Sequence, residues 1–191
     1  MTVGDSNSRS GAIWVWATLV LATLTVVGSI SLTLVAGLKP CPLCFYQRTF
    51  AMGLLGLVAV GLLMRVQPAA LAVGALPMVV GGFGVSVFHV YLELSKTLDC
   101  PVGLLGLATA PQQSFGMYVL LVISVLAAGL AARVKPGFFL AGGLLGVVFA
   151  VLSCVSNGPL PSTPNPKFDD AGNRVVIGCE PHWDESMPAD G

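Results

Sequence analysis

The stretch VQPAALAVGALPMVVGGFGVSVFHVYL, Val66–Leu92, contains no Asp, Glu, Lys or Arg. It is longer than the roughly 20 apolar residues that an α-helix needs to cross a bilayer. Four further intervals also lack these charged residues, namely 10–38, 49–64, 100–132 and 136–166. Because backbone polar groups inside lipid must pair within their own segment, each span is expected to be a helix. The sequence therefore predicts five membrane-spanning helices.

The composition agrees with a membrane protein. The 191 residues are 55% hydrophobic and 9% charged, whereas soluble domains carry about 25% charged residues. This hydrophobicity makes the lipid bilayer an expected partner. The net charge is zero, so we expect no binding to nucleic acid. The interval 49–64 is short for a span, and we expect its flanking arginines to reach the membrane surface by snorkelling. The last helix is expected to run from Gly137 to about Ser153.

Three regions follow from this pattern. Residues 1–135 are expected to form a four-helix bundle, residues 136–155 a fifth transmembrane helix, and residues 156–191 an irregular tail outside the membrane. The tail begins with a proline-rich stretch and continues as a polar segment, a composition typical of loosely ordered chain. The predicted fold class is an all-α integral membrane protein.

The cysteines are predicted to share one side of the membrane. If the helices cross the bilayer back and forth, every odd-numbered helix ends on the side opposite the N-terminus. Cys41 and Cys44 follow the first helix, Cys100 follows the third, and Cys154 and Cys179 follow the fifth. Disulfides persist in oxidising compartments such as the bacterial periplasm. We therefore expect a cytoplasmic N-terminus, with the cysteines and the C-terminal tail in the periplasm.

Cys41 and Cys44 form a CxxC pair, which closes a very small ring. Such a ring gains little from loop-closure entropy, so its disulfide is easily made and broken. If a helix begins near Cys44, its unpaired N–H groups and dipole stabilise a thiolate there. Arg48 lies four residues further along, on the same helical face, and adds a permanent positive charge. These features indicate redox chemistry at Cys44.

The main alternative is a non-catalytic membrane protein that uses Cys41 and Cys44 as metal ligands or as an electron-carrier pair. A zinc site usually needs a second CxxC or a closely spaced His/Cys pair. The sequence has no such pair, and its histidines, His89 and His182, are far apart. The sequence therefore disfavours a metal site.

The nine residues PCPLCFYQR, Pro40–Arg48, placed directly after the first helix, resemble the signature of the DsbB family of quinone-linked thiol oxidases. The resemblance extends to the order of the first four helices, to His89 near the outer end of the third, and to Gly103–Gln113. It covers roughly residues 10–135. Vitamin K epoxide reductase-like enzymes use similar thiol–quinone chemistry, but their CxxC normally lies late in the chain.

The resemblance implies a reaction in the bacterial inner membrane. A membrane quinone, either ubiquinone or menaquinone, accepts two electrons from the CxxC pair, and the new disulfide passes through a second cysteine pair to a soluble DsbA-like thioredoxin-fold protein. Carried over to this chain, Cys44 faces the quinone and Cys41 exchanges with the second pair. Arg48 holds a quinone carbonyl, and Gln47 and His89 are further candidates for binding the quinone.

The second cysteine pair departs from the family pattern. The family keeps it between the third and fourth helices, where this chain has only Cys100. Cys154 and Cys179 are the remaining candidates, which leaves three pairings open: Cys100–Cys154, Cys100–Cys179 and Cys154–Cys179. The last requires no contact between separate loops, and we favour it as the resting disulfide. A tail carrying Cys179 could instead relay the disulfide between the partner and Cys100.

Overall fold

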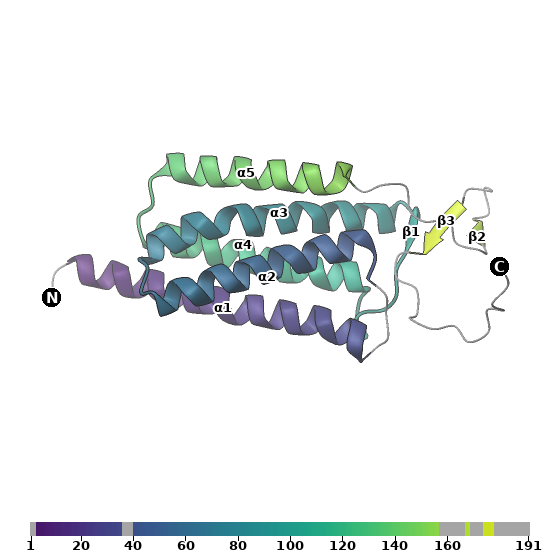
Figure 1. Cartoon of the computed structure of the whole chain (residues 1–191), viewed down its shortest axis with the longest axis horizontal. Coiled ribbons are helices and arrows are strands. Elements are labelled where there is room, and N and C mark those ends of the chain that lie inside the picture. The colour runs from purple at the N-terminus through teal and green to yellow at the C-terminus, as the bar shows by residue number, and fades with distance from the viewer. Residues whose placement is uncertain (1–2, 36–39, 157–166, 169–173, 178–191) are drawn as a thin grey trace.

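The structure is a computed structural model of the whole chain, and it describes residues 3–35, 40–156, 167–168 and 174–177. Figure 1 shows long helices that run side by side. They are α1 (Val3–Leu34), α2 (Pro42–Leu63), α3 (Pro68–Leu94), α4 (Ala110–Ala131) and α5 (Pro136–Val155). All five are long and apolar enough to cross a membrane, α1 over Ser10–Leu34. The predicted all-α, multi-pass membrane fold is confirmed.

Prolines mark where the helices begin. α2, α3, α4 and α5 each carry a proline at the first or second helical position. Proline suits this place because its missing N–H is one that a helix start leaves unpaired, and its fixed φ is already helical. α2 therefore starts at Pro42, seven residues before the charge-free interval 49–64 begins. The short span expected from that interval is in fact a helix of 22 residues that includes Arg48.

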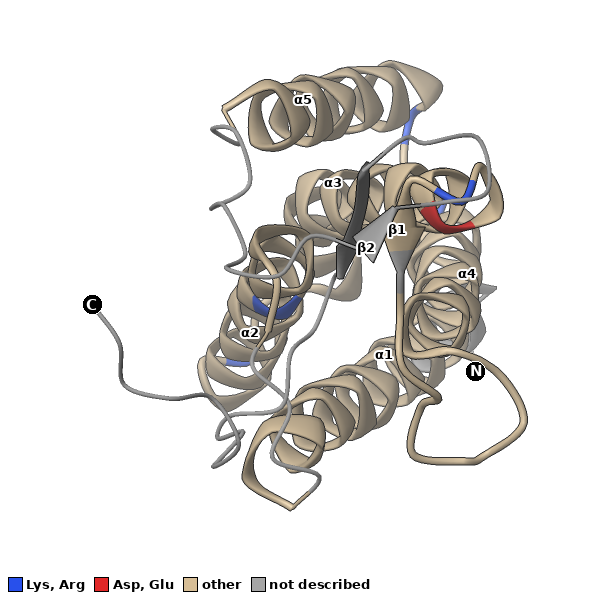
Figure 2. Ribbon diagram, turned by 90° about the vertical axis from the view of Figure 1, so that its right-hand side faces the viewer, with Lys and Arg blue, Asp and Glu red and all other residues tan. Residues whose placement is uncertain are grey.

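The first four helices form a closed ring in which α1 contacts α2, α2 contacts α3, α3 contacts α4, and α4 contacts α1. The end-on view in Figure 2 shows α5 outside this ring, against α3. Small residues permit the close approach of α5. A Cβ on Gly146 of α5 would lie 2.6 Å from the Cβ of Val80 on α3, and a Cβ on Gly84 of α3 would lie 2.6 Å from that of Ala150.

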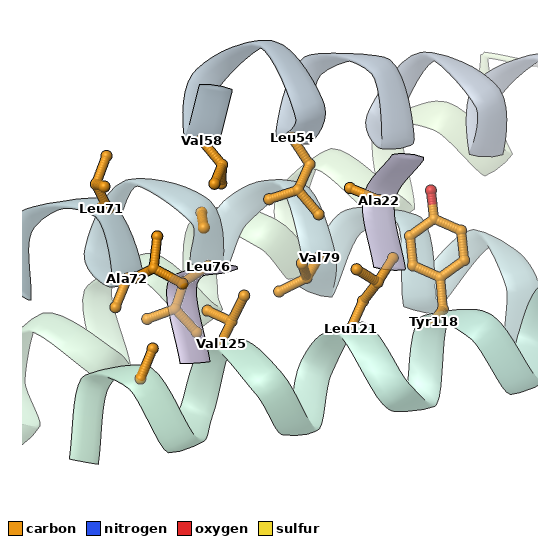
Figure 3. Close-up of a cluster of buried hydrophobic side chains, with 13 residues drawn as sticks. Ala22, Leu54, Val58, Leu71, Ala72, Leu76, Val79, Tyr118, Leu121 and Val125 are labelled. Carbon is orange, nitrogen blue, oxygen red and sulfur yellow. The ribbon is translucent and has the colours of Figure 1, made fainter. Parts of the chain in front are cut away.

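The bundle interior is packed with aliphatic side chains and one tyrosine (Figure 3). Leu54 of α2, Val79 of α3 and Leu121 of α4 are completely buried there. The outer faces are also apolar: Leu63 is 84% and Leu144 is 67% exposed. Because lipid is as apolar as these side chains, close packing rather than withdrawal from water holds the helices together.

A short sheet lies at the end of the bundle where α1, α3 and α5 finish (Figure 1). Its strands are β1 (Leu98–Asp99), β2 (Lys167–Phe168) and β3 (Arg174–Ile177), in the order β1-β3-β2. β3 pairs with β1 in parallel and with β2 antiparallel. The expected irregular tail thus contains two short strands. The run Val175-Val176-Ile177 is β-branched, which favours extended backbone.

Candidate active site

The two cysteines of the CxxC pair lie at the first turn of α2. Cys41 is the N-cap residue and Pro42 opens the helix, so Cys44 falls in the first turn. The two Sγ atoms are 3.2 Å apart. The backbone N–H of Cys44 donates to Cys41 Sγ at 3.3 Å. The helix start was predicted to act on the Cys44 sulfur, but the N–H donor that this turn supplies points to the sulfur of Cys41.

The Arg48 side chain turns toward α1. Its Nε donates to Ser29 Oγ at 2.9 Å, and its Nη2 donates to Ser29 O and Thr33 Oγ1, both at 2.7 Å. Within the described ranges these are its only hydrogen bonds and no carboxylate pairs with it, so Nη1 retains its donor capacity. A guanidinium in a membrane-spanning helix that no carboxylate neutralises is a candidate for binding a ligand.

Cys44, Gln47 and Arg48 border a cavity of about 120 Å³ between α1, α2, α4 and the loop before α4. Cys41 and His89 do not line it. The remaining lining residues are mostly apolar or carry hydroxyl or amide groups: Leu24, Thr25, Gly28, Ser29, Leu32, Thr33, Pro40, Leu104, Ala110, Gln113, Ser114, Met117 and Tyr118. The cavity is therefore an apolar compartment with one thiol and one guanidinium at its edge.

His89 lies behind this cavity and is completely buried. Its Nε2 is 3.8 Å from Cys41 Sγ and 3.6 Å from Cys100 Sγ. Its Nδ1 is 3.5 Å from the side-chain nitrogen of Gln47, whose other amide atom accepts a hydrogen bond from Ser114 at 2.9 Å. The ring thus lies near two cysteine sulfurs, and Gln47 connects it to the cavity.

The two cysteines of the CxxC pair therefore face different surroundings. Cys44 is half-buried and borders the cavity, whereas Cys41 is buried and lies beside His89. Cys154, near the end of α5, packs against the small apolar cluster that includes Cys41 and Leu43. Four of the five cysteines are thus gathered at one end of the bundle. Cys179 lies outside the described residues, so the Cys154–Cys179 disulfide stays a prediction.

The residues that support Arg48 and Gln47 were not predicted from the sequence. Ser29 and Thr33 are four residues apart on α1 and both bond Arg48. Ser114 and Tyr118 are four residues apart on α4; Ser114 donates to the Gln47 side chain, and the Tyr118 hydroxyl donates to its backbone carbonyl. Polar residues at this spacing share one helical face, so each pair was a detectable signal in an otherwise apolar helix.

Comparison with known protein families shows where this chain belongs. The family model described as "Disulfide bond formation protein DsbB" matches residues 10–116, which is more than half of the chain. This match includes the CxxC pair, Arg48, His89 and Cys100, and it ends before α5. Comparisons with curated proteins and with solved structures find no match. The chain therefore belongs to the DsbB family of membrane disulfide bond formation proteins.

Proposed function

We propose that this protein is a quinone-dependent thiol oxidase. It reoxidises a soluble DsbA-like thioredoxin-fold protein and passes the electrons through Cys41 and Cys44 to a membrane quinone. The proposal rests on the different surroundings of the two cysteines of the CxxC pair. Cys44 borders an apolar cavity together with Arg48, while Cys41 lies beside His89, whose Nε2 is also close to Cys100 Sγ.

The cavity residues fit a quinone. Its wall is mostly apolar, as a lipid-soluble ring requires, and Arg48 offers charge-assisted donors to a carbonyl oxygen. Ser29 and Thr33 fix the guanidinium, so its donors are already oriented. Arg48 and Gln47 would hold the ring next to Cys44. A bound quinone supplies an acceptor for the two electrons and two protons that Cys41 and Cys44 release on forming their disulfide.

The position of Cys41, which is buried beside His89, supports disulfide exchange with a second cysteine pair. A thiolate of the second cysteine pair attacks the Cys41–Cys44 disulfide at Cys41, forming one S–S bond as the Cys44 thiolate leaves. The second thiolate of that pair then displaces Cys41 and closes the second-pair disulfide. His89 is the nitrogen base nearest to both Cys41 and Cys100 in the described chain. We propose that it accepts and returns the thiol proton during this exchange.

The tail supplies the missing partner of Cys100 in this scheme. The pairing of β1 with β3 sets Asp99, one residue before Cys100, beside Ile177, two residues before Cys179. Neighbouring strands lie about 4.8 Å apart and one residue spans about 3.3 Å, so this pairing supports a reachable Cys100–Cys179 bridge. The β1–β3 pairing therefore favours a Cys100–Cys179 bridge, whereas the sequence alone favoured a Cys154–Cys179 bridge.

The proposed location is the bacterial inner membrane, with the N-terminus in the cytoplasm. The gathering of Cys41, Cys44, Cys100 and Cys154 at one end of the bundle supports this orientation, since exchange with a soluble oxidant needs that end in the periplasm. Labelling of single-cysteine variants with a membrane-impermeant maleimide in intact spheroplasts tests it. Labelling of Cys100 only after lysis would refute the orientation.

Turnover by the purified protein tests the function. Under anaerobic conditions, full-length protein is mixed with ubiquinone or menaquinone and a reduced DsbA-like dithiol protein, and quinol formation is followed by absorbance. We expect the protein to form one quinol for each partner disulfide. Cys44→Ser is expected to abolish turnover. Failure to reduce either quinone, or equal turnover by Cys44→Ser, would show that the proposed function is wrong.

A further inference from the structure

Three side chains with metal-binding atoms meet beside the CxxC motif, and the thiol of Cys100 lies next to one of them. The ligand atoms of Cys41, Cys44 and His89 all lie within 4.8 Å of one another. Cys100 approaches the same His89 nitrogen from the loop after α3, with its Sγ 3.6 Å from Nε2. The sequence disfavoured a metal site because the histidines are far apart, but α3 and α2 bring His89 against the cysteine pair.

Two of the distances already match a tetrahedral zinc site, and small movements of the cysteine sulfurs would complete it. Zinc binds Cys sulfur at about 2.3 Å and His nitrogen at about 2.05 Å in a tetrahedron, which places sulfur and nitrogen about 3.6 Å apart and two sulfurs about 3.8 Å apart. His89 Nε2 lies 3.8 Å from Cys41 Sγ and 3.6 Å from Cys100 Sγ. The Cys41 and Cys44 sulfurs, 3.2 Å apart, need to separate by about half an ångström to reach that spacing.

Gln47 can support binding through Nε2 after a turn of its amide. A zinc-binding imidazole usually donates its other ring N–H to a polar acceptor. In this structure the Gln47 nitrogen lies 3.5 Å from Nδ1, while its oxygen accepts from Ser114 Oγ. Exchanging the two amide atoms would place the oxygen at Nδ1 and let the nitrogen donate to Ser114 Oγ. His89 is completely buried and Cys41 nearly so, so a bound ion would be shielded from water.

We propose that the reduced protein binds one Zn²⁺ through Cys41, Cys44, Cys100 and His89, and that the ion arrests the enzyme. The three thiols bind as thiolates, so binding releases up to three protons, and no electrons are transferred. Once Cys41 and Cys44 are joined in a disulfide, two of the four ligands are lost. The site is thus present only in the reduced state. While zinc is bound, the thiolates of Cys41 and Cys44 are metal ligands and cannot be oxidised by the quinone.

Metal binding by the full-length protein in both redox states tests the site. Protein reduced with a phosphine and protein oxidised with diamide are each dialysed against ZnCl₂, and zinc per chain is measured by atomic emission. We expect one tightly held zinc per reduced chain and at least 100-fold weaker binding after oxidation. Co²⁺ in place of zinc should give the absorption of a tetrahedral thiolate site. Equal zinc binding by the oxidised protein would overturn the proposal.

Single substitutions test the ligand set. Cys100→Ser and His89→Gln should each weaken zinc binding at least tenfold. Cys154→Ser removes a thiol that is not one of the four proposed ligands, and it should leave zinc binding unchanged. Wild-type affinity in Cys100→Ser would refute the four-ligand site, as would loss of zinc in Cys154→Ser. Gel filtration identifies any variant that fails to fold. The comparison of the two redox states of the wild-type protein needs no variant.

The arrest rests on the proposed function, but the two can fail separately. Metal-free reduced protein is given quinone with and without one equivalent of Zn²⁺, and EDTA is added afterwards. We expect zinc to stop quinol formation and EDTA to restore it. If metal-free protein makes no quinol, the oxidase function is wrong while the binding result stands. If quinol forms at the same rate with zinc bound, the arrest is wrong.

Discussion

Replacing Arg48 by alanine should weaken quinone use more than any other change at the cavity that spares the cysteines. A hydrogen bond from a charged group contributes about 1.5–3 kcal/mol, and a factor of ten corresponds to about 1.4 kcal/mol. We therefore expect Arg48→Ala to raise the apparent KM for quinone by about 10- to 150-fold.

The hydrogen bonds of Arg48 to α1 predict a graded series of increases in the KM for quinone. Thr33→Val removes one neutral acceptor of the guanidinium while its two bonds to Ser29 remain. A bond of this kind contributes about 0.5–1.5 kcal/mol, so KM should rise only about two- to tenfold. Arg48→Lys keeps the charge but cannot reproduce the fork that bonds Ser29 and Thr33 together. Its effect should therefore fall between those of Thr33→Val and Arg48→Ala.

The assay is anaerobic quinol formation at varied quinone concentration, with the dithiol partner held in excess. Arg65→Ala is the matched control, because it removes the same side chain beyond the opposite end of α2, outside the cavity. It should leave the KM for quinone at the wild-type value. An unchanged KM in Arg48→Ala, or an equal rise in Arg65→Ala, would refute the reasoning.

Two further predictions concern packing and the second disulfide. A Cβ on Gly82 would lie 2.2 Å from the Tyr118 ring, whereas one on Gly143 would meet nothing within 4 Å. Gly82→Ala should therefore lower the free energy of unfolding in detergent by about 1–3 kcal/mol and Gly143→Ala should not; equal stabilities would contradict the packing. Peptide mapping of the unreduced protein should recover a Cys100–Cys179 disulfide, and a bridge from Cys179 to another cysteine would contradict this pairing.

The fold class and the position of the cysteines at one end of the bundle could be predicted from the sequence. Long charge-free intervals have one structural solution in lipid, and alternate crossing then sets which ends lie together. The charge-free interval 49–64 covers only part of α2, because Arg48 interrupts the apolar run without ending the helix. In the structure that arginine lies within the helix, and Ser29 and Thr33 of α1 accept hydrogen bonds from its Nε and Nη2.

The neighbours of His89 could not be predicted from the sequence. Its approach to Cys41 and Cys100 depends on how far α3 is rotated and shifted against α2, which is set by packing over the whole interface. A similar limit applies to the pairing of β1 with β3, because a strand of two residues has no sequence pattern of its own. Contacts between distant segments are fixed by tertiary packing rather than by local propensity.

A single-turnover measurement tests the central claim, which is that electrons leave the Cys41–Cys44 pair for a quinone. A variant with Cys100, Cys154 and Cys179 replaced by serine retains only this pair. The prereduced variant is mixed with excess quinone without oxygen, and both quinol and protein thiols are counted. We predict one quinol formed and two thiols lost per chain. No quinol, or the same yield after Cys44→Ser is added to the variant, would contradict the account.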